Sequence, residues 1–590
     1  ADEDCSGPTV SVVLPVYNCA TTLQRSVESV LAQSFGDFEL IIVDDASTDD
    51  TYRVAREIAS SDERIAVLRL PQNSKCLRAR QVGVEASSGE YIMFLDGDDA
   101  YAPFALETVV EEVRKKPVDI LHFPLETVSP VDGTRTGSNT FFEPYEGTVE
   151  GADKILEACF SKGLMNWNLV NKAFRGSVCR YAFKDLPAGG IQRGEDLVAF
   201  TFLAHYSESY RGIAGKALYR YYYGAGQDGD KPINLNEFKD FCASSKAAHL
   251  IQRQLEAWCA PRQVIEGFES VERRLLDNCT HKFKEYLPGN DKTEGLDVLF
   301  SSWGYRKSLV ALMYPYWSQP ASFAKMVEGT ELVSAVRRPI RNVAAYYRTC
   351  EGGGAENVLR QLTQLWLTQG YRVTWFLEVE PASASVVPEG VDVAIIPSAG
   401  GSPTDYRARF NELSEALERY DIDAVVYHQW LSNTLLWDML AVKAHKASLI
   451  VHCHGLFTNQ MRFGLYGFST MPPVYSLADG IVVINPIDKL FWSYFSRSVY
   501  QTNNILEDPT GYASHAPKTK RQVLWLGRLS PEKHPEKVVE IARRTKSLDP
   551  SITFAVAGSA TTSEYERKLQ EMADDAGVAD TVTFLGWCDG

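Results

Sequence analysis

Short apolar runs rich in β-branched residues alternate with amphipathic segments at the start of this chain. Residues 10–15, 39–43 and 91–95 are such runs, and residues 21–33 carry apolar side chains at helical spacing. Such runs are typical of buried strands, and strands that helices separate are joined by crossover connections, which make them parallel. The alternation therefore predicts a parallel α/β sheet with helices on both faces and a ligand site at the carboxyl ends of its strands.

The same alternation starts again near residue 341 and a third time near residue 523, after long amphipathic segments such as 238–258 and 264–286. We therefore predict four parts: an α/β domain over 1–233, a helical appendage or spacer over 234–335, a second Rossmann-like domain over 336–510 and the start of a third over 511–590. A complete Rossmann-like domain usually needs more residues than the last part holds, so we expect it to be incomplete at Gly590.

Composition narrows the classes of function. The chain has 60 Lys and Arg against 76 Asp and Glu, a net charge of −16, so we expect no nucleic acid polymer as a partner. No apolar run approaches the roughly 18 residues of a membrane span. The eleven cysteines are odd in number and form no C-x-x-C pair, which is typical of a reduced compartment. We therefore expect a cytoplasmic location, with peripheral association at the inner face of the membrane left open.

Three carboxylates follow the apolar run at residues 91–95: Asp96, Asp98 and Asp99. Alternate residues of an extended chain point the same way, so Asp96 and Asp98 can converge on one ligand. Such a pair favours a hard divalent cation, Mg²⁺ or Mn²⁺, which in turn binds the phosphate oxygens of a nucleotide. The alternative is a solvated Asp/Gly turn, and these residues alone leave both interpretations open.

Other polar and aromatic residues follow the neighbouring predicted strands. Tyr17 offers a stacking face, and a carboxylate such as that of Asp45 can accept a hydrogen bond from a nucleobase. Lys75, Arg78 and Arg80 can neutralise a diphosphate, or they can pair with surface acids. The alternative for the acidic segment around Asp45 is that Asp49 or Ser47 caps the following helix.

These segments resemble the successive motifs of family 2 glycosyltransferases of the GT-A fold. Residues 11–18, 42–49 and 94–99 carry the resemblance, which extends over about residues 8–225. It implies an inverting, metal-dependent transfer of a sugar from a UDP-sugar donor to a glycan or lipid-linked acceptor. The donor and its nucleotide would be held by Pro15, Tyr17, Asp45, Asn73, Arg80 and Asp96, and the Mn²⁺ or Mg²⁺ ion by Asp96 and Asp98.

Residues 167–174 and 194–200 extend the resemblance. In the family an acidic pair supplies the catalytic base, so Asp196 would remove the proton of the acceptor hydroxyl and Glu195 would orient the sugar or the acceptor. The residues alone favour a simpler interpretation, in which the acidic pair starts a helix and interacts with its dipole. Lys172 would contact phosphate or sugar, with an ordinary surface lysine as the alternative.

The second half of the chain carries a different pattern. Gly353 and Gly354 lie between a predicted strand and a helix, where free backbone N–H groups form an anion site, and Arg528 and Lys533 follow another predicted strand. Two cations can offset a diphosphate without a metal. The alternatives are a plain hinge and ordinary surface charge. With His454 these residues resemble family 4 glycosyltransferases of the GT-B fold, over about residues 342–590. Taken alone, a single histidine such as His454 is more often structural or at the surface.

That resemblance implies a second donor site, formed by Gly353, Gly354, His454, Arg528 and Lys533, for which no cofactor is expected. His534 stands where the family usually has glycine, and we interpret His428 and His452 as structural. The acidic motif that completes this site in the family would lie beyond Gly590. We therefore expect the second half to be inactive in this chain.

We predict a bifunctional glycosyltransferase of the α/β class. A GT-A Rossmann-like domain is followed by a helical region, a GT-B Rossmann-like domain and part of a second GT-B domain. The predicted pathway is the synthesis of a cell-surface polysaccharide or glycolipid. The alternatives are a nucleotide-sugar-binding module that has lost catalysis and a sugar nucleotidyltransferase. The latter usually has a glycine-rich basic loop after its first strand, where this chain has residues 16–20.

Overall fold

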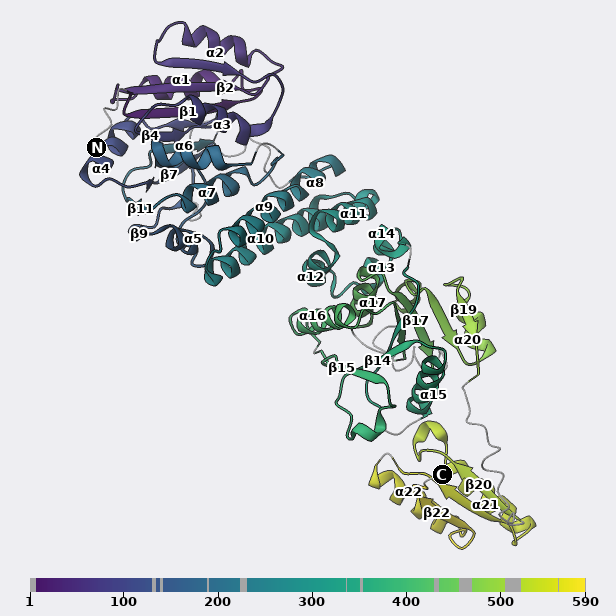
Figure 1. The fold of residues 1–590 in the computed structure, drawn as a ribbon. Coiled ribbons are helices and arrows are strands. Elements are labelled where there is room, and N and C mark those ends of the chain that lie inside the picture. Colours follow the sequence, from purple (N-terminus) through teal and green to yellow (C-terminus); the bar gives the residue numbers. More distant parts are fainter. Residues whose placement is uncertain are drawn as a thin grey trace. The chain divides into compact units, whose positions relative to one another are not determined.

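The computed structural model describes residues 7–588, apart from residues 130–133, 138–141, 188–189, 223–230, 336, 351–353, 400, 429–433, 456–469, 504–520 and 561. The chain divides into two compact units, Ala1–Ile505 and Leu506–Gly590 (Figure 1). Among the described residues, no helix is both long and apolar enough to cross a membrane.

The first α/β domain is built on an eight-stranded sheet with the order β3-β2-β1-β4-β10-β6-β11-β9. Strands β1 to β4 are parallel, whereas β10 is antiparallel to β4 and β9 to β11, so the predicted parallel sheet is mixed. A smaller, four-stranded sheet of the same domain has the order β5-β12-β7-β8. The strands are β1 (Val10–Val16), β2 (Phe38–Asp44), β3 (Ile65–Arg69), β4 (Tyr91–Phe94), β5 (Ala100–Tyr101), β6 (Ile120–His122), β7 (Leu125–Val128), β8 (Arg135–Gly137), β9 (Thr148–Glu150), β10 (Lys172–Arg175), β11 (Ser209–Gly212) and β12 (Tyr219–Tyr222).

Apolar cores lie on both faces of β1, which explains why its sequence is an unbroken apolar run. Val13 packs into one core, while Val12 and Leu14 pack into another, and every residue of the strand is buried. The helices of this domain are α1 (Leu23–Leu31), α2 (Thr51–Ala59), α3 (Lys75–Ala86), α4 (Ala105–Lys115), α5 (Ala152–Phe160), α6 (Gly176–Asp185) and α7 (Glu195–His205).

Consecutive helices follow the first domain, as the sequence predicts, but the segment 238–258 is not one helix. It is divided at Ala243 into α8 and α9; both helices pack on α10 and α11, and α9 also packs on α7. A capping box of Asn234 and Glu237 begins α8. The helices are α8 (Leu235–Cys242), α9 (Ser244–Ala257), α10 (Arg262–Tyr286), α11 (Lys292–Trp303), α12 (Tyr305–Tyr316), α13 (Pro320–Glu328) and α14 (Glu331–Ser334).

A second sheet of seven parallel strands follows, with the order β15-β14-β13-β16-β17-β18-β19. Its strands are β13 (Asn342–Tyr347), β14 (Arg372–Leu377), β15 (Val391–Ile395), β16 (Ala424–Tyr427), β17 (Ser448–Cys453), β18 (Gly480–Val483) and β19 (Val499–Gln501). The helices are α15 (Gly354–Thr368), α16 (Pro403–Arg419), α17 (Leu435–Ala444), α19 (Met471–Tyr475) and α20 (Pro486–Trp492). This doubly wound pattern is the Rossmann-like arrangement that the sequence predicts.

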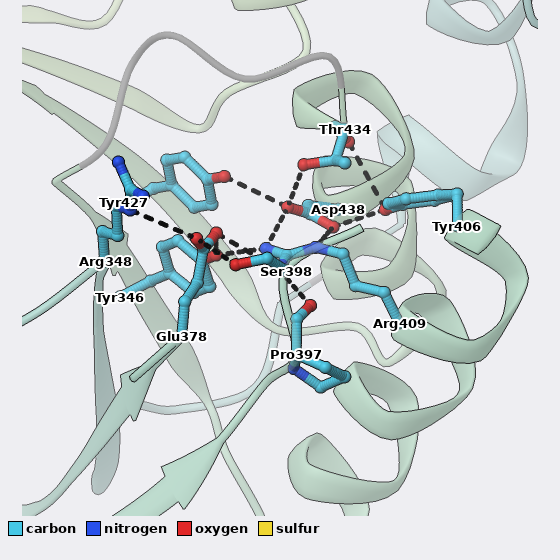
Figure 2. A network of polar contacts seen from close by, with 10 residues as sticks. All are labelled: Tyr346, Arg348, Glu378, Pro397, Ser398, Tyr406, Arg409, Tyr427, Thr434 and Asp438. Atoms are coloured by element: carbon cyan, nitrogen blue, oxygen red, sulfur yellow. Dashed lines mark hydrogen bonds and ion pairs between the residues drawn. The ribbon is translucent and has the colours of Figure 1, made fainter. Parts of the chain in front are cut away.

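A network of buried polar side chains lies at the carboxyl ends of β14 and β16 (Figure 2). The guanidinium of Arg409, in α16, donates to Asp438 of α17 at 2.9 Å and to Glu378, which follows β14, at 3.3 Å. Tyr427, the last residue of β16, donates to Asp438 at 3.1 Å. Removing one partner of a buried ion pair costs about 3–5 kcal/mol, so this network holds α16 and α17 on the sheet.

The second unit contains a parallel three-stranded sheet in the order β20-β21-β22, and helices α21 and α22 belong to the same unit. Gly558, with φ 138°, follows β21, and a Cβ atom there would lie 1.9 Å from the carbonyl oxygen of Gly527, so only glycine fits. The elements are β20 (Gln522–Leu526), α21 (Glu536–Leu548), β21 (Thr553–Ala557), α22 (Ser563–Asp575) and β22 (Val582–Gly586).

Candidate active site

The carboxyl ends of three neighbouring strands form the candidate site of the first domain. Because β2, β1 and β4 are adjacent in the sheet, the residues that follow them meet at one edge. Pro15 lies within β1 and is buried, whereas Tyr17, just beyond the strand, is 44% exposed. Asp45 follows β2, and Asp96 follows the residue after β4. The structure thus brings together at one edge the strand-end residues that the sequence singles out.

The loops at this edge are held in unusual backbone conformations. Asn18, Ala46 and Lys75 have φ angles of 53°, 57° and 71°, in the left-handed region that few non-glycine residues adopt. The backbone N–H of Asn18 donates to Ser47 Oγ at 3.0 Å, and Asn18 Oδ1 accepts from the backbone of Thr48 at 2.9 Å. These bonds join the loops after β1 and β2. Such conformations cluster at ligand sites, where the surrounding contacts offset their cost.

Asp45 is fixed against the start of α3. Its two carboxylate oxygens accept from the backbone N–H groups of Ser74, at 2.6 Å, and Lys75, at 2.8 Å. Burial raises the pKa of this carboxyl group, and the two N–H groups oppose the increase. Nearby, Asn73 Oδ1 is buried and has no hydrogen-bond partner among the described residues. The edge therefore offers an unused acceptor beside an anchored carboxylate.

Arg80 connects the two acidic motifs. Its guanidinium donates to Asp96 at 2.9 Å and also contacts Asp196, which lies 116 residues further along the chain. The Arg80 side chain is 2% exposed, whereas the side chains of Asp96 and Asp196 are 36% and 25% exposed. The arginine is thus enclosed by the domain, and both of its partners remain accessible.

The acidic residues after β4 have different environments. The Asp99 carboxylate is buried and accepts from the hydroxyl of Tyr219 at 2.7 Å and from the backbone of Tyr222 at 2.9 Å. Burial, and then the charges of Asp96 and Asp98, hold the pKa of Asp99 well above its usual range. Asp99 is therefore part of the scaffold, while Asp96 and Asp98 are half-buried at the site.

This donor set fits a hard divalent cation. Asp96 and Asp98 present carboxylate oxygens next to the acidic pair Glu195 and Asp196, and the charge of Arg80 offsets only part of theirs. Burial raises the pKa of Asp96, Arg80 opposes the increase, and the neighbouring aspartates add to it. Crowded carboxylates of this kind are stabilised by a cation that oxygen ligands prefer, such as Mg²⁺ or Mn²⁺.

Glu195 and Asp196 form the first turn of α7, so the simpler helix-start interpretation also describes their place in the fold. Gly194 precedes them with φ 81°, and a Cβ atom there would lie 3.0 Å from Ala247 of α9. The helical region thus supports the backbone that carries the acidic pair. Burial, and then the charge of Asp196, raise the pKa of Glu195.

Lys172 is enclosed, and the alternative of an ordinary surface lysine is wrong. The residue is fully buried, and its ammonium donates to Asn166 Oδ1 at 2.9 Å and to the backbone carbonyl of Asn168. Burial lowers the pKa of Lys172 to about 7. A direct contact with phosphate or sugar stays a prediction, and it requires the loop at residues 166–171 to open.

Arg25, in α1, is a further residue of this site that no sequence motif indicates. Its guanidinium donates to the backbone carbonyl of Asp98 and lies 3.8 Å from the ring centroid of Tyr222. Arg25 therefore supports the turn that carries the candidate metal ligand. A lone arginine in an amphipathic segment gives no signal of such a role, because the contact spans 73 residues of sequence.

The predicted residues of the second site lie in both units. Gly354 is the first residue of α15 and Gly353 lies outside the described residues, whereas His454 follows β17. Arg528 and Lys533 belong to the second unit, where both are exposed. His534 has φ 52°, which explains why glycine suits its position in the family.

Comparisons with known proteins agree with this order of domains. The family described as Glycosyl transferase family 2 matches residues 11–185, Glycosyltransferase Family 4 matches 352–489, and Glycosyl transferases group 1 matches 512–590. The UDP-Glc:alpha-D-GlcNAc-diphosphoundecaprenol beta-1,3-glucosyltransferase WfaP of Escherichia coli is 30% identical over 231 residues, which cover 33% of this chain and 88% of WfaP. The chain belongs to the glycosyltransferases.

Other relatives of this glycosyltransferase match shorter stretches. The putative glycosyltransferase EpsE of Bacillus subtilis is 40% identical over 111 residues, which cover 19% of this chain and 40% of EpsE. The glycosyltransferase GlyG of Streptococcus pneumoniae is 29% identical over 170 residues, 28% of this chain and 53% of GlyG. The chain thus spans about half or less of the length of these two relatives.

Solved structures of low identity also align with this glycosyltransferase. The crystal structure of S. aureus TarS 1-349 in complex with UDP aligns with a TM-score of 0.37 and 16% identity, over 54% of this chain and 86% of that one. The predicted family 2 and family 4-like halves and the α/β class are confirmed by the family matches and the fold. The roles of individual site residues and the domain bounds stay predictions.

Proposed function

We propose that the first domain of this glycosyltransferase transfers a sugar from a UDP-sugar to a glycan or lipid-linked acceptor, with inversion at the anomeric carbon. One observation carries the proposal: Arg80 bridges Asp96 and Asp196, so the predicted metal and base motifs lie together at the edge where parallel sheets bind ligands. The name of WfaP, of which this chain covers 88%, specifies UDP-glucose and a diphosphoundecaprenol-linked acceptor, which supports the same classes of substrate here.

The donor nucleotide would lie over the loops after β1 and β2. Tyr17, being exposed, offers a face for the uracil ring. Each oxygen of Asp45 already accepts one backbone N–H, and its remaining lone pairs can accept from the base. The unpartnered Oδ1 of Asn73 would accept a further N–H or O–H of the nucleoside. These three side chains give the donor stacking and hydrogen-bond partners without a change of fold.

Asp96 and Asp98 would hold Mn²⁺ or Mg²⁺, and the bound ion supplies positive charge to the departing diphosphate. Arg80 adds a fixed guanidinium beside the same carboxylates. Because Arg80 is enclosed by the domain, it cannot follow a ligand into solvent, and it keeps Asp96 oriented toward the site. Arg80 is therefore a positioning residue for both motifs.

Asp196 would act as the base. The acceptor hydroxyl oxygen attacks the anomeric carbon as Asp196 takes its proton, and the bond from that carbon to the UDP oxygen breaks. Glu195 would orient the sugar or the acceptor from the same helical turn. Arg80 holds one oxygen of Asp196, and the 25% exposure of this side chain leaves it open to the acceptor.

We place the reaction in the synthesis of a cell-surface polysaccharide. TuaG of Bacillus subtilis, named as a putative teichuronic acid biosynthesis glycosyltransferase, is 42% identical over 109 residues, 18% of this chain and 43% of TuaG. A lipid-linked acceptor would bring this chain to the inner face of a membrane, so a cytoplasmic, peripheral location belongs to the same proposal.

The test measures UDP release from a panel of UDP-sugars, with Mn²⁺ or with EDTA, by the full chain and by matched variants. We expect metal-dependent release that Asp98→Ala abolishes and that Arg528→Ala, in the other unit, leaves unchanged. Release that survives Asp98→Ala but is lost in Arg528→Ala would assign transfer to the second half. Binding of UDP without turnover, for every donor and acceptor tried, would favour a domain that has lost catalysis.

A further inference from the structure

Three histidines meet at the carboxyl edge of the second sheet. His428 follows β16, His452 lies in β17 and His454 follows it. Tyr427 and Val451 are paired in the register of β16 and β17, so the next residues, His428 and His452, lie side by side. His454 lies two residues beyond His452 and returns to the same face of an extended chain. The strand register of β16 and β17 and the alternation of side chains along the extended chain therefore bring the three histidines together.

The ring nitrogens are close enough to share one ion. The ring centroid of His428 lies 5.2 Å from the centroid of His452 and 5.2 Å from that of His454. The centroids of His452 and His454 are 4.3 Å apart. One potential ligand atom from each residue lies within 4.8 Å of the others. Zinc–nitrogen bonds of about 2.0–2.1 Å in a tetrahedron place ligand nitrogens about 3.4 Å apart, so small side-chain rotations suffice.

Two of these nitrogens are buried without a partner. His428 and His452 are 1% and 4% exposed, and Nε2 of each has no hydrogen-bond partner within the described part of the chain. His428 Nδ1 lies 2.9 Å from His454 Nε2, so the cluster satisfies itself only in part. A buried polar atom without a partner is rare and calls for an explanation.

The histidines are also in the protonation state that metals bind. Burial lowers the pKa of His452 to about 3 and of His454 to about 4, and it holds the pKa of His428 well below its usual range. All three imidazoles are therefore neutral near pH 7, and each has a lone pair for a metal. A cluster of charged imidazoles would instead repel a cation.

We propose that His428, His452 and His454 bind one Zn²⁺ ion. Imidazole nitrogen is a preferred ligand of zinc, and three histidines leave one coordination position for water or for an oxygen of a ligand. The site lies where doubly wound sheets bind their ligands, in the half whose resemblance to family 4 glycosyltransferases implies no cofactor. It is independent of the Asp96 and Asp98 pair, which offers only oxygen ligands.

The test uses the full chain without a histidine tag. After removal of metals with a chelator, the protein is titrated with ZnCl₂ by calorimetry, and bound metal is counted after gel filtration. We expect one tightly bound Zn²⁺ per chain. Because loss of a residue that only orients a ligand weakens metal binding 10–100-fold, His452→Ala and His454→Ala should weaken it on the order of a hundredfold or more.

Matched variants separate a lost ligand from a lost fold. His534→Ala removes an exposed histidine of the second unit, and Asp98→Ala removes a candidate ligand of the first site, so both should bind zinc as the parent chain does. His454→Cys replaces one metal ligand by another, and it should restore binding and give a thiolate charge-transfer band with Co²⁺. This rescue would not occur if His454 only filled space.

Two outcomes would overturn the proposal. In the first, the parent chain binds Zn²⁺ no more tightly than the His452→Ala variant does. The three residues would then be a neutral histidine cluster packed by ring contacts. The other is zinc binding that disappears in Asp98→Ala and persists in the histidine variants. Circular dichroism of each variant confirms that a loss of binding is not a loss of fold.

Discussion

Two buried arginines, Arg80 in the first α/β domain and Arg409 in the second, each bridge two carboxylates at the edge of a sheet. The arginines are equally enclosed, at 2% and 1% exposure, but their partners differ. The carboxylates that Arg80 holds are 36% and 25% exposed, whereas those that Arg409 holds are 9% and 1% exposed. The same ion-pair chemistry thus serves a ligand site in one domain and the scaffold in the other.

The two arginine sites differ because only the carboxylates paired with Arg80 are accessible to solvent. Partly exposed carboxylates can exchange some of their bound water for a cation or a substrate hydroxyl. Buried carboxylates have no access to either and remain paired with the arginine. The second sheet instead presents neutral histidines at its edge. Similar sheets therefore offer oxygen ligands in one domain and nitrogen ligands in the other, and the fold alone does not assign the chemistry.

The largest effect expected is on catalysis in the first domain. Asp196→Asn keeps the shape of the side chain but cannot accept the proton, so kcat for sugar transfer should fall on the order of 10²–10⁴-fold. UDP release with a fixed donor and acceptor measures it, and Arg528→Ala is the control. If Glu195→Gln loses more activity than Asp196→Asn, the two roles must be exchanged.

Next comes stability in the second domain. Arg409→Met leaves the buried Asp438 without its ion-pair partner and Glu378 with only the exposed Arg348, so it should lower the free energy of local unfolding of α16 and α17 by about 3–5 kcal/mol. Hydrogen exchange of peptides from these helices measures it. Arg348→Met is the matched control, because Arg348 is 69% exposed and lies 4.0 Å from the same Glu378, so its loss should cost less than about 1 kcal/mol. If Arg348→Met lowered the free energy of local unfolding as much as Arg409→Met does, the buried ion pairs of Arg409 would not be what stabilises these helices.

A third test uses Lys172, whose pKa burial lowers to about 7. Between this pH and the ordinary lysine value near 10.4, the unfolded chain binds a proton that the folded chain does not, so stability should rise with pH. The slope should be at most about 1.4 kcal/mol per pH unit. Lys172→Met should lose that slope and the exposed control Lys162→Met should keep it, as denaturant unfolding at pH 7–10 would show.

The smallest expected effect is on the affinity for the UDP-sugar donor. Asn73→Ala removes a buried acceptor that has no partner among the described residues, so the fold should lose no stability. One hydrogen bond to the nucleotide is worth about 0.5–1.5 kcal/mol, so KM for the UDP-sugar should rise about 2- to 10-fold with kcat unchanged. An unchanged KM would remove Asn73 from the donor site.

Some of these features follow from local sequence patterns, and others depend on contacts between distant residues. The strands before Tyr17 and Asp45 were predictable, because the apolar runs and the polar residues after them are local signals. The burial of Lys172 was not, because it depends on contacts between residues far apart in the chain, such as that of its ammonium with the Phe200 ring of α7. The histidine cluster was also missed, since His428 and His452 become neighbours only through strand register. The apolar spacing over 238–258 likewise gave no sign of the division into two helices at Ala243.

The amino-acid sequence by itself determined that two α/β halves follow one another, that each sheet has polar residues at its carboxyl edge, and that the first edge is acidic. These features depend on side-chain periodicity and on neighbours along the chain. Only the tertiary structure decided that Arg80 joins two distant acidic motifs, that Asp99 is buried, and that His428, His452 and His454 lie close together. Each of these depends on which elements pack together, and packing brings into contact residues that no local pattern relates.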